Sequence, residues 1–217
     1  MALEAVIFDM DGTLVDSMPY HYKSWEVFFE QQGIYLTKEE FDSIHHGTLF
    51  DIMPRIFGDI SHEESYRLGM IKEQAFRELY KHEIKPIDGL VEWLEALKKA
   101  GLKIGLGTAA DFTNADFTVD AIDIRKYFDV IVTSDIVKEG KPSPAVYLKV
   151  AEMLQVNPAG CVVFEDTLSG IQAGLSAGMK VIGITTGLSK EEMQVLPVSA
   201  VIDHYQSLSL HHITSLF

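Results

Sequence analysis

The sequence predicts an α/β fold, a doubly wound and mostly parallel sheet with an all-helical domain inserted after its first strand. Short apolar, β-branched runs recur along the chain, and most lack the two-residue alternation of a half-exposed strand, as parallel strands covered on both faces do. From residue 89 onward these runs alternate with helical patterns. Residues 18–83, by contrast, contain helical patterns and no strand-like run.

Six runs have the composition of buried strands, and each is short enough to be one. They are Ala5–Phe8, Leu102–Thr108, Val130–Thr133, Cys161–Phe164, Lys180–Thr185 and Ala200–Ile202. We therefore expect six strands, the first of them separated from the others by the inserted domain.

Helices are expected between the later strands. Gly89–Ala100 carries its apolar residues on one helical face. Ser143 and Pro144 fit the N-cap and first position of a second helix. Thr167 or Ser169 starts a third, which follows the fourth strand.

The expected domains are discontinuous in sequence. Residues 1–16 and 84–217 form the sheet-bearing core, and residues 17–83 form the helical insertion. Within the insertion, Pro19–Gln32 has aromatic residues at helical spacing, and two capping-box patterns mark the starts of further helices. The patterns are Thr37 with Glu40, and Ser61 with Glu64.

The chain is strongly acidic. Its 217 residues include 18 Lys and Arg against 32 Asp and Glu, a net charge of -14. Such a surface repels nucleic acid and anionic lipid, because phosphate recognition needs basic clusters. It would also repel a small anionic substrate, unless cations are placed locally or a divalent metal is bound.

Targeting and redox features indicate a cytoplasmic protein. The N-terminus lacks the basic region of a signal peptide, and no apolar stretch approaches the roughly 20 residues of a membrane span. The single cysteine, Cys161, excludes a disulfide framework and a Cys-based zinc site within one chain. We expect no membrane or nucleic-acid partner, and the sequence carries no indication of oligomeric state. The adjacent histidines His45-His46 and His211-His212 are interpreted as surface residues.

Polar side chains follow four of the expected strands, at the carboxyl ends where open α/β sheets bind ligands. They are Asp9 and Asp11 after the first strand, Thr108 at the end of the second, Lys141 after the third, and Glu165 and Asp166 at the end of the fourth. Hard oxygen ligands without imidazole or thiolate favour Mg²⁺, which takes substrate phosphate oxygens as further ligands. The lysine and the threonine suit the remaining phosphate oxygens. Asp9 suits a nucleophile toward phosphorus, and Asp11 a general acid and base.

These residues resemble the four motifs of the haloacid dehalogenase superfamily, in order and spacing. The motifs are Asp9-Met10-Asp11-Gly12-Thr13, Thr108, Lys141 and Glu165-Asp166. The stretches Gly140–Pro144 and Val163–Thr167, with Gly170, resemble its β-phosphoglucomutase-like branch. The insertion matches the helical cap of that branch, so the resemblance covers nearly the whole chain and implies a Rossmann-like core with a cap.

The resemblance implies the roles of the core residues. Asp9 forms an aspartyl-phosphate intermediate, and Asp11 is the general acid and base. Thr108 and Lys141 bind the transferring phosphoryl group, and Lys141 also holds Asp9 against repulsion from its acidic neighbours. The cap closes over the site, excludes water and selects the leaving group.

The resemblance also implies a metal site. Mg²⁺ is held by Asp9, the backbone carbonyl of Asp11 and Asp166, with Glu165 as a further ligand, either direct or through another ligand. In the cap, His21 stands at the position of a mutase histidine that contacts the general-acid region. Lys72 falls where the branch has a substrate-facing lysine.

Other features of the mutases are missing. Thr108 is followed by Ala109-Ala110-Asp111-Phe112, where mutases have a Ser-Lys-Asn-like clamp for the second phosphate of the sugar. Gly47–Asp51, which matches the stretch that carries a cap arginine in mutases, contains no arginine. A bisphosphate would lose its second anchor and meet Asp111 instead, which favours hydrolysis of a monophosphorylated substrate.

The sequence therefore predicts a phosphatase of this superfamily, a Mg²⁺-dependent phosphohydrolase acting on a small phosphorylated metabolite such as a sugar phosphate. A β-phosphoglucomutase-like phosphosugar mutase and an inorganic pyrophosphatase are the alternative enzymes. The non-enzyme alternative is a phospho-accepting signalling module of receiver type. A receiver is shorter, lacks an inserted cap, and has no second carboxylate two residues beyond its phosphorylated one.

Overall fold

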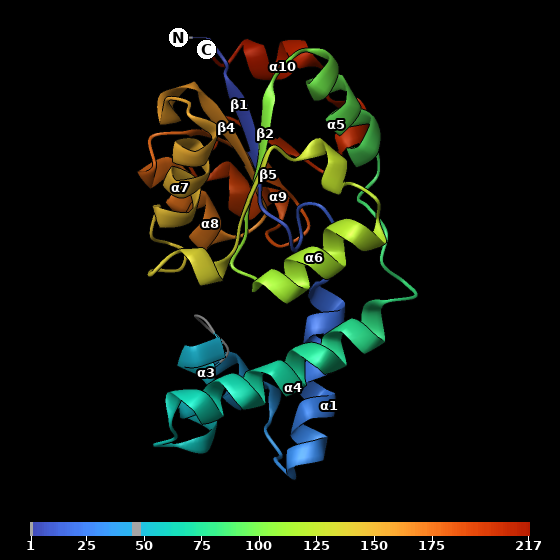
Figure 1. Ribbon diagram of the computed structural model, residues 1–217, viewed down its shortest axis with the longest axis vertical. Helices are drawn as coiled ribbons and strands as arrows, with labels where there is room; N and C mark the ends of the chain where they lie inside the picture. Colours follow the sequence, from blue (N-terminus) through green and yellow to red (C-terminus); the bar gives the residue numbers. More distant parts are fainter. Residues whose placement is uncertain (1, 45–48) are drawn as a thin grey trace. The chain divides into compact units, whose positions relative to one another are not determined.

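The computed structural model describes residues 2–44 and 49–217 (Figure 1). The chain divides into two compact units, one formed by Met1–Asp16 with Ile84–Phe217 and the other by Ser17–Glu83. The His45-His46 pair and the first residues of the stretch Gly47–Asp51 lie outside the described residues. None of the described helices combines the length and apolar character that crossing a membrane requires.

The larger unit contains a six-stranded sheet in the order β3-β2-β1-β4-β5-β6, with every neighbouring pair parallel. The strands are β1 (Ala5–Phe8), β2 (Lys103–Gly107), β3 (Val130–Val132), β4 (Cys161–Glu165), β5 (Lys180–Ile184) and β6 (Ala200–Ile202). The strand order changes direction at β1, which places the topological switch point between β1 and β4. The predicted doubly wound parallel sheet is confirmed, as are all six expected strands.

Both faces of β1 are covered, which explains its unbroken apolar sequence. Ala5 and Ile7 belong to the core that includes side chains of α7 (Ala145–Leu154) and α8 (Leu168–Ser176). Phe8 stacks on Phe164 of β4, with ring centroids 5.1 Å apart, on the other side of the sheet.

The remaining helices of this unit connect and cover the strands (Figure 1). They are α5 (Leu90–Lys99), α6 (Phe112–Ala121), α9 (Lys190–Gln194) and α10 (Leu210–Thr214), with four short 3₁₀ turns, η1 (Arg125–Tyr127), η2 (Ser134–Ile136), η3 (Pro158–Gly160) and η4 (Tyr205–Ser207). His211 and His212 of α10 are exposed, as expected.

Two helix starts refine the expectations. Pro144 is the N-cap of α7 rather than its first residue, because the N–H of Leu148 donates to the Pro144 carbonyl (2.9 Å) and so opens the helical ladder there. Of the two candidates for the start of α8, Thr167 is the cap, since its hydroxyl accepts the N–H of Gly170 (3.1 Å).

The smaller unit consists of helices in its described part: α1 (Met18–Gln32), α2 (Lys38–Ile44), α3 (Leu49–Phe57) and α4 (His62–Tyr80). Their apolar sides enclose a core that contains Trp25, Phe28, Phe29, Ile52, Met53 and Leu68.

One of the two predicted capping boxes forms in full. Thr37 and Glu40 exchange both bonds, whereas Ser61 only accepts the N–H of Glu64 (3.1 Å). The second box is half formed because the Glu64 carboxylate binds Arg67, one helical turn along, through two hydrogen bonds.

Candidate functional site

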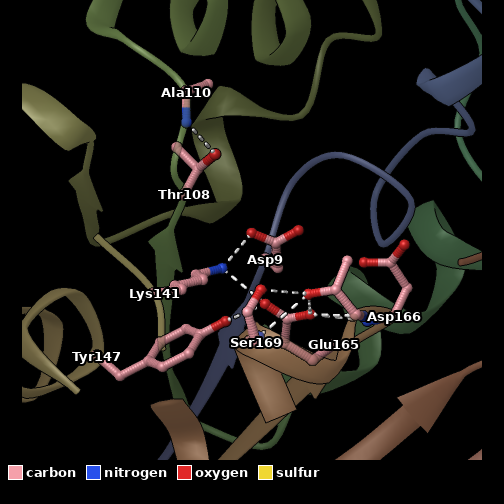
Figure 2. Close-up of polar contacts among 10 residues, drawn as sticks. Asp9, Thr108, Ala110, Lys141, Tyr147, Glu165, Asp166 and Ser169 are labelled. Carbon is pink, nitrogen blue, oxygen red and sulfur yellow. Dashed lines mark hydrogen bonds and ion pairs between the residues drawn. The ribbon is translucent and has the colours of Figure 1, made fainter. Parts of the chain in front are cut away.

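Three carboxylates meet where β1 and β4 end (Figure 2). Phe8 pairs with Phe164 across these strands, so the next residues, Asp9 and Glu165, are neighbours, and Asp166 follows. One oxygen from each of the three carboxylates lies within 4.8 Å of the others. Asp9 is 6% exposed, Glu165 1% and Asp166 0%. Burial of three acids together is unfavourable unless positive charge accompanies them.

Lys141 supplies one positive charge. Its Nζ donates to Asp9 Oδ1 (2.5 Å) and to Glu165 Oε1 (2.7 Å), as Figure 2 shows. The lysine side chain is buried and its Nζ lies 4.7 Å from the ring centroid of Tyr147. Thr108, also buried, follows β2, and its hydroxyl accepts the N–H of Ala110 (3.0 Å).

Glu165 is the most heavily bonded of the three carboxylates. Its Oε1 accepts the Lys141 ammonium and the hydroxyl of Tyr147 (2.8 Å). Its Oε2 accepts the N–H groups of Asp166 (2.9 Å) and Thr167 (3.0 Å) and the Thr167 hydroxyl (3.0 Å). Glu165 therefore anchors Lys141 and the turn into α8. The sequence did not indicate a site role for Tyr147, because its place in the expected helix is that of a core aromatic. It indicated only a capping role for Thr167.

Asp166 has the opposite environment. Neither of its oxygens has a hydrogen-bond partner among the described residues, although both are buried. Backbone crowds them, because a Cβ at Gly12 would lie 2.0 Å from Asp166 Oδ2 and a Cβ at Gly187 would lie 2.4 Å from it. Thr13 Oγ1, nearby in sequence to Gly12, is likewise buried and unpartnered in the described part of the chain. Unsatisfied carboxylate oxygens beside two more acids are the mark of a cation site, and an oxygen-only set suits Mg²⁺.

The electrostatics agree with that interpretation. Burial raises the pKa of Asp166 to about 9, with the charges of Asp9 and Glu165 adding to the rise. Burial also raises the pKa of Asp9 to about 7, although Lys141 opposes the rise. Burial lowers the pKa of Lys141, but the carboxylates of Asp9 and Glu165 outweigh it, so its net pKa is above the ordinary value. Burial acts to raise the pKa of Glu165, but the charge of Lys141 and its hydrogen bond act against burial, and the net pKa is below the ordinary value. Lys141 therefore pairs with Asp9 and Glu165, while the Asp166 carboxyl has no bonded cation among the described residues.

Asp11 lies at the rim of this cluster, half-buried, in a turn stabilised by Gly12. The Gly12 N–H donates to the Val15 carbonyl (2.8 Å), and Gly12 has φ +77°, in the left-handed region that favours glycine. The charge of Asp11 is among the smaller influences that raise the pKa of Asp9 and Asp166, after burial.

In the helical unit, the two predicted cap residues are bonded to each other. Lys72 Nζ lies 2.9 Å from His21 Nδ1 and donates to Glu73 Oε1 (2.9 Å). The imidazole of His21 stacks on Phe76 with ring centroids 3.8 Å apart. Lys72 is only 2% exposed, so it is a buried, paired lysine rather than a solvated one. The sequence did not indicate a role for Glu73, because adjacent Lys and Glu residues on a helix are usually both exposed at the surface.

Asp111 has a local structural role. Its side chain caps α6 by accepting the N–H of Asn114 (2.8 Å), and the N–H of Phe112 donates to Asp135 (2.7 Å). The loop after Thr108 is therefore held in place by these two hydrogen bonds.

We expect Asp166→Asn to stabilise the metal-free protein. A carboxyl whose pKa is raised in the folded state binds its proton more tightly there than in the unfolded state. As the pH rises above the ordinary pKa of the carboxyl, the free energy of unfolding therefore falls. Between pH 5 and 9 this slope comes from Asp166 and, up to about pH 7, from Asp9. Glu165 and Lys141 titrate outside that window in both states.

Urea unfolding in EDTA at pH 5, 7 and 9 measures this effect. At pH 7 the variant should be more stable than wild type by on the order of 1–3 kcal/mol. Its stability should also fall less steeply from pH 5 to 9. An Asp166→Asn protein less stable than wild type at pH 9 would contradict the raised pKa.

Comparisons with known proteins agree with the geometry. A family model described as haloacid dehalogenase-like hydrolase matches residues 6–184. A phosphorylated carbohydrates phosphatase from Thermotoga maritima is 35% identical over 193 residues, covering 86% of this chain and 88% of that protein. A beta-phosphoglucomutase from Bacillus subtilis is 32% identical over 196 residues, covering 85% and 84%. The crystal structure of a HAD hydrolase, family IA, variant 3, from Entamoeba histolytica has a TM-score of 0.89 and 32% identity, covering 99% of both chains.

Proposed function

Because this chain belongs to the haloacid dehalogenase-like hydrolase family, we propose that it is a Mg²⁺-dependent phosphatase of a small phosphorylated carbohydrate. The observation that supports it most is the buried cluster at the ends of β1 and β4, in which Lys141 binds Asp9 and Asp166 lacks a partner. The named relatives support the substrate class, since one of them is a phosphatase of phosphorylated carbohydrates.

Asp9 is the nucleophile of the proposed reaction. Lys141 holds its Oδ1, which leaves Oδ2 to attack phosphorus. The new bond joins Asp9 to phosphorus as the bond from phosphorus to the leaving oxygen breaks. Asp11 donates a proton to that oxygen, then accepts a proton from the water that hydrolyses the aspartyl-phosphate. Lys141 and Thr108 bind the phosphoryl oxygens during both steps.

The residues that would hold Mg²⁺ are Asp9, Asp166 and the backbone carbonyl of Asp11, with Glu165 contributing through oxygens that already accept other donors. The ion supplies positive charge, which keeps Asp9 ionised and offsets the charge of the phosphoryl group. In the helical unit, His21 and Lys72 are the residues proposed from the sequence for substrate selection, and they are bonded to each other.

A phosphosugar mutase is the second candidate, favoured by the similarity to a beta-phosphoglucomutase. The loop after Thr108 argues against it, because it offers a second phosphate the capping acid Asp111 and no cation.

We expect phosphate release from monophosphorylated sugars to exceed mutase turnover. The experiment compares phosphate release across sugar phosphates, nucleotides and pyrophosphate, with Mg²⁺ and with EDTA. A parallel assay follows glucose 6-phosphate formation from β-glucose 1-phosphate with a catalytic bisphosphate present. The Asp9→Asn protein, prepared identically, controls for contaminating phosphatases. Mutase turnover manyfold faster than every hydrolysis would overturn the proposal in favour of the isomerase.

A further inference from the structure

A loop outside the four sequence motifs borders the acidic cluster. It follows β5 and runs over residues 185–189 to the start of α9. The N–H of Leu188 donates to the backbone carbonyl of Asp166 (3.1 Å), so this loop is bonded to the segment that carries the unpartnered acid.

The same loop is bonded to the turn after β1. The Thr186 hydroxyl donates to the Gly12 carbonyl, a contact between residues 174 positions apart in sequence. The next carbonyl, that of Thr13, accepts the hydroxyl of the buried Tyr205 (2.9 Å). Two consecutive carbonyls of the turn that carries Asp11 are therefore fixed by side chains from distant parts of the core.

Gly187, the next residue of the loop, lies against Asp166. A Cβ there would lie 2.4 Å from Asp166 Oδ2 and 2.8 Å from the Asp166 carbonyl oxygen. The Asp166 carboxylate thus lies against the backbone of both Gly12 and Gly187, with both oxygens buried and unpartnered among the described residues. The loop after β5 touches both segments that would hold the cation, Asp11–Gly12 and Asp166.

We propose that Thr186 and Gly187 are positioning residues for the cation, setting the separation between the Asp11–Gly12 turn and Asp166. This inference rests on the proposed Mg²⁺ site. Mg²⁺ demands near-ideal octahedral geometry, so its affinity depends on how well its ligands are placed before it binds. Thr186 is bonded to the Gly12 carbonyl and Leu188 to the Asp166 carbonyl, so the loop joins the two segments directly and fixes their separation.

The neighbouring threonine provides a matched control. The Thr185 hydroxyl donates to Asp203 Oδ1 (2.7 Å), away from both acid-bearing segments. Thr185→Val and Thr186→Val therefore make the same chemical change at adjacent positions, and each removes one hydroxyl hydrogen bond. Only Thr186→Val releases the Gly12 carbonyl.

The test is calorimetric titration of each protein with Mg²⁺ alone, in the absence of substrate. Thr186→Val should bind Mg²⁺ about tenfold more weakly than wild type, as the loss of a supporting partner of a metal site does. Thr186→Ser, which keeps the hydroxyl, should bind within about twofold of wild type, and Thr185→Val should be unchanged. In the activity assay, Thr186→Val should need more Mg²⁺ for half-saturation and recover most of its kcat at high Mg²⁺.

Gly187→Ala tests the same inference without removing a hydrogen bond, because its methyl group displaces the Asp166 carboxylate. It should also weaken Mg²⁺ binding at least about tenfold, and metal-free thermal melts verify that each variant is folded. Wild-type Mg²⁺ affinity in Thr186→Val or in Gly187→Ala, or an equal loss in Thr185→Val, would overturn this inference and leave the proposed phosphatase standing. Failure of the wild-type protein to bind Mg²⁺ would overturn both.

Discussion

Asp9→Asn should lower steady-state phosphate release by at least about 10⁴-fold, the scale seen when an enzyme loses its nucleophile. The amide oxygen can still accept the Lys141 ammonium, so the local geometry is kept, but an amide is a poor nucleophile toward phosphorus. The variant should remain folded, since removing a buried carboxylate whose pKa is raised to about 7 relieves repulsion within the cluster.

The assay is phosphate release at saturating Mg²⁺ with the best substrate from the panel. Asp59→Asn, the same change at an exposed position of the helical unit, is the control and should retain wild-type turnover. Appreciable activity in a purified Asp9→Asn protein, above about one part in a hundred, would rule out the covalent mechanism.

Asp11→Asn provides the contrast. With an activated leaving group it should still give a burst of leaving group, because formation of the phosphoenzyme needs little acid catalysis whereas its hydrolysis needs a base.

Much of the core could be predicted from sequence because its signals are local. A strand such as β1, buried at every residue, has an unbroken apolar sequence, and helix caps such as Thr167 stand beside the helices they start. Carboxyl ends of parallel strands share one edge of the sheet, so polar residues after β1 and β4 were expected to meet, and the structure brings Asp9 and Glu165 together there.

The unpredicted parts depend on partners far away in sequence. Nothing in the sequence distinguishes Thr186, which bonds to Gly12, from Thr185, which bonds to Asp203. The same is true of Tyr147, whose hydroxyl reaches Glu165 although its position in α7 fits a core aromatic. From the sequence, Glu165 could be a ligand either directly or through another ligand. In the structure its oxygens accept bonds from five donors, while those of Asp166 have none among the described residues.

Lys141→Met should both unfold the protein more easily and abolish turnover. Methionine keeps the approximate volume of lysine but leaves Asp9 and Glu165 as buried acids without a cation. Removing one partner of a buried ion pair costs about 3–5 kcal/mol, chiefly because the remaining charge is uncompensated. Turnover should fall by at least about 10³-fold, since the phosphoryl group loses a cation on which its developing charge depends. Urea unfolding in EDTA at pH 7 and phosphate release at saturating Mg²⁺ measure the two effects.

Adding Glu165→Gln to Lys141→Met separates these two roles of the lysine. The glutamine oxygen can keep the donors from Asp166 and Thr167, while its NH₂ group lies toward Tyr147 in place of a charged oxygen. Because one uncompensated charge is removed, the double variant should recover a large part of the lost free energy of unfolding. It should not recover turnover, because the lysine ammonium proposed to bind the phosphoryl oxygens is still missing. A Lys141→Met protein within about 1 kcal/mol of wild type, or a double variant no more stable than the single one, would mean that the pairing of Lys141 with the acids contributes little to folding. Recovery of turnover in the double variant would instead show that Lys141 acts only by neutralising Glu165.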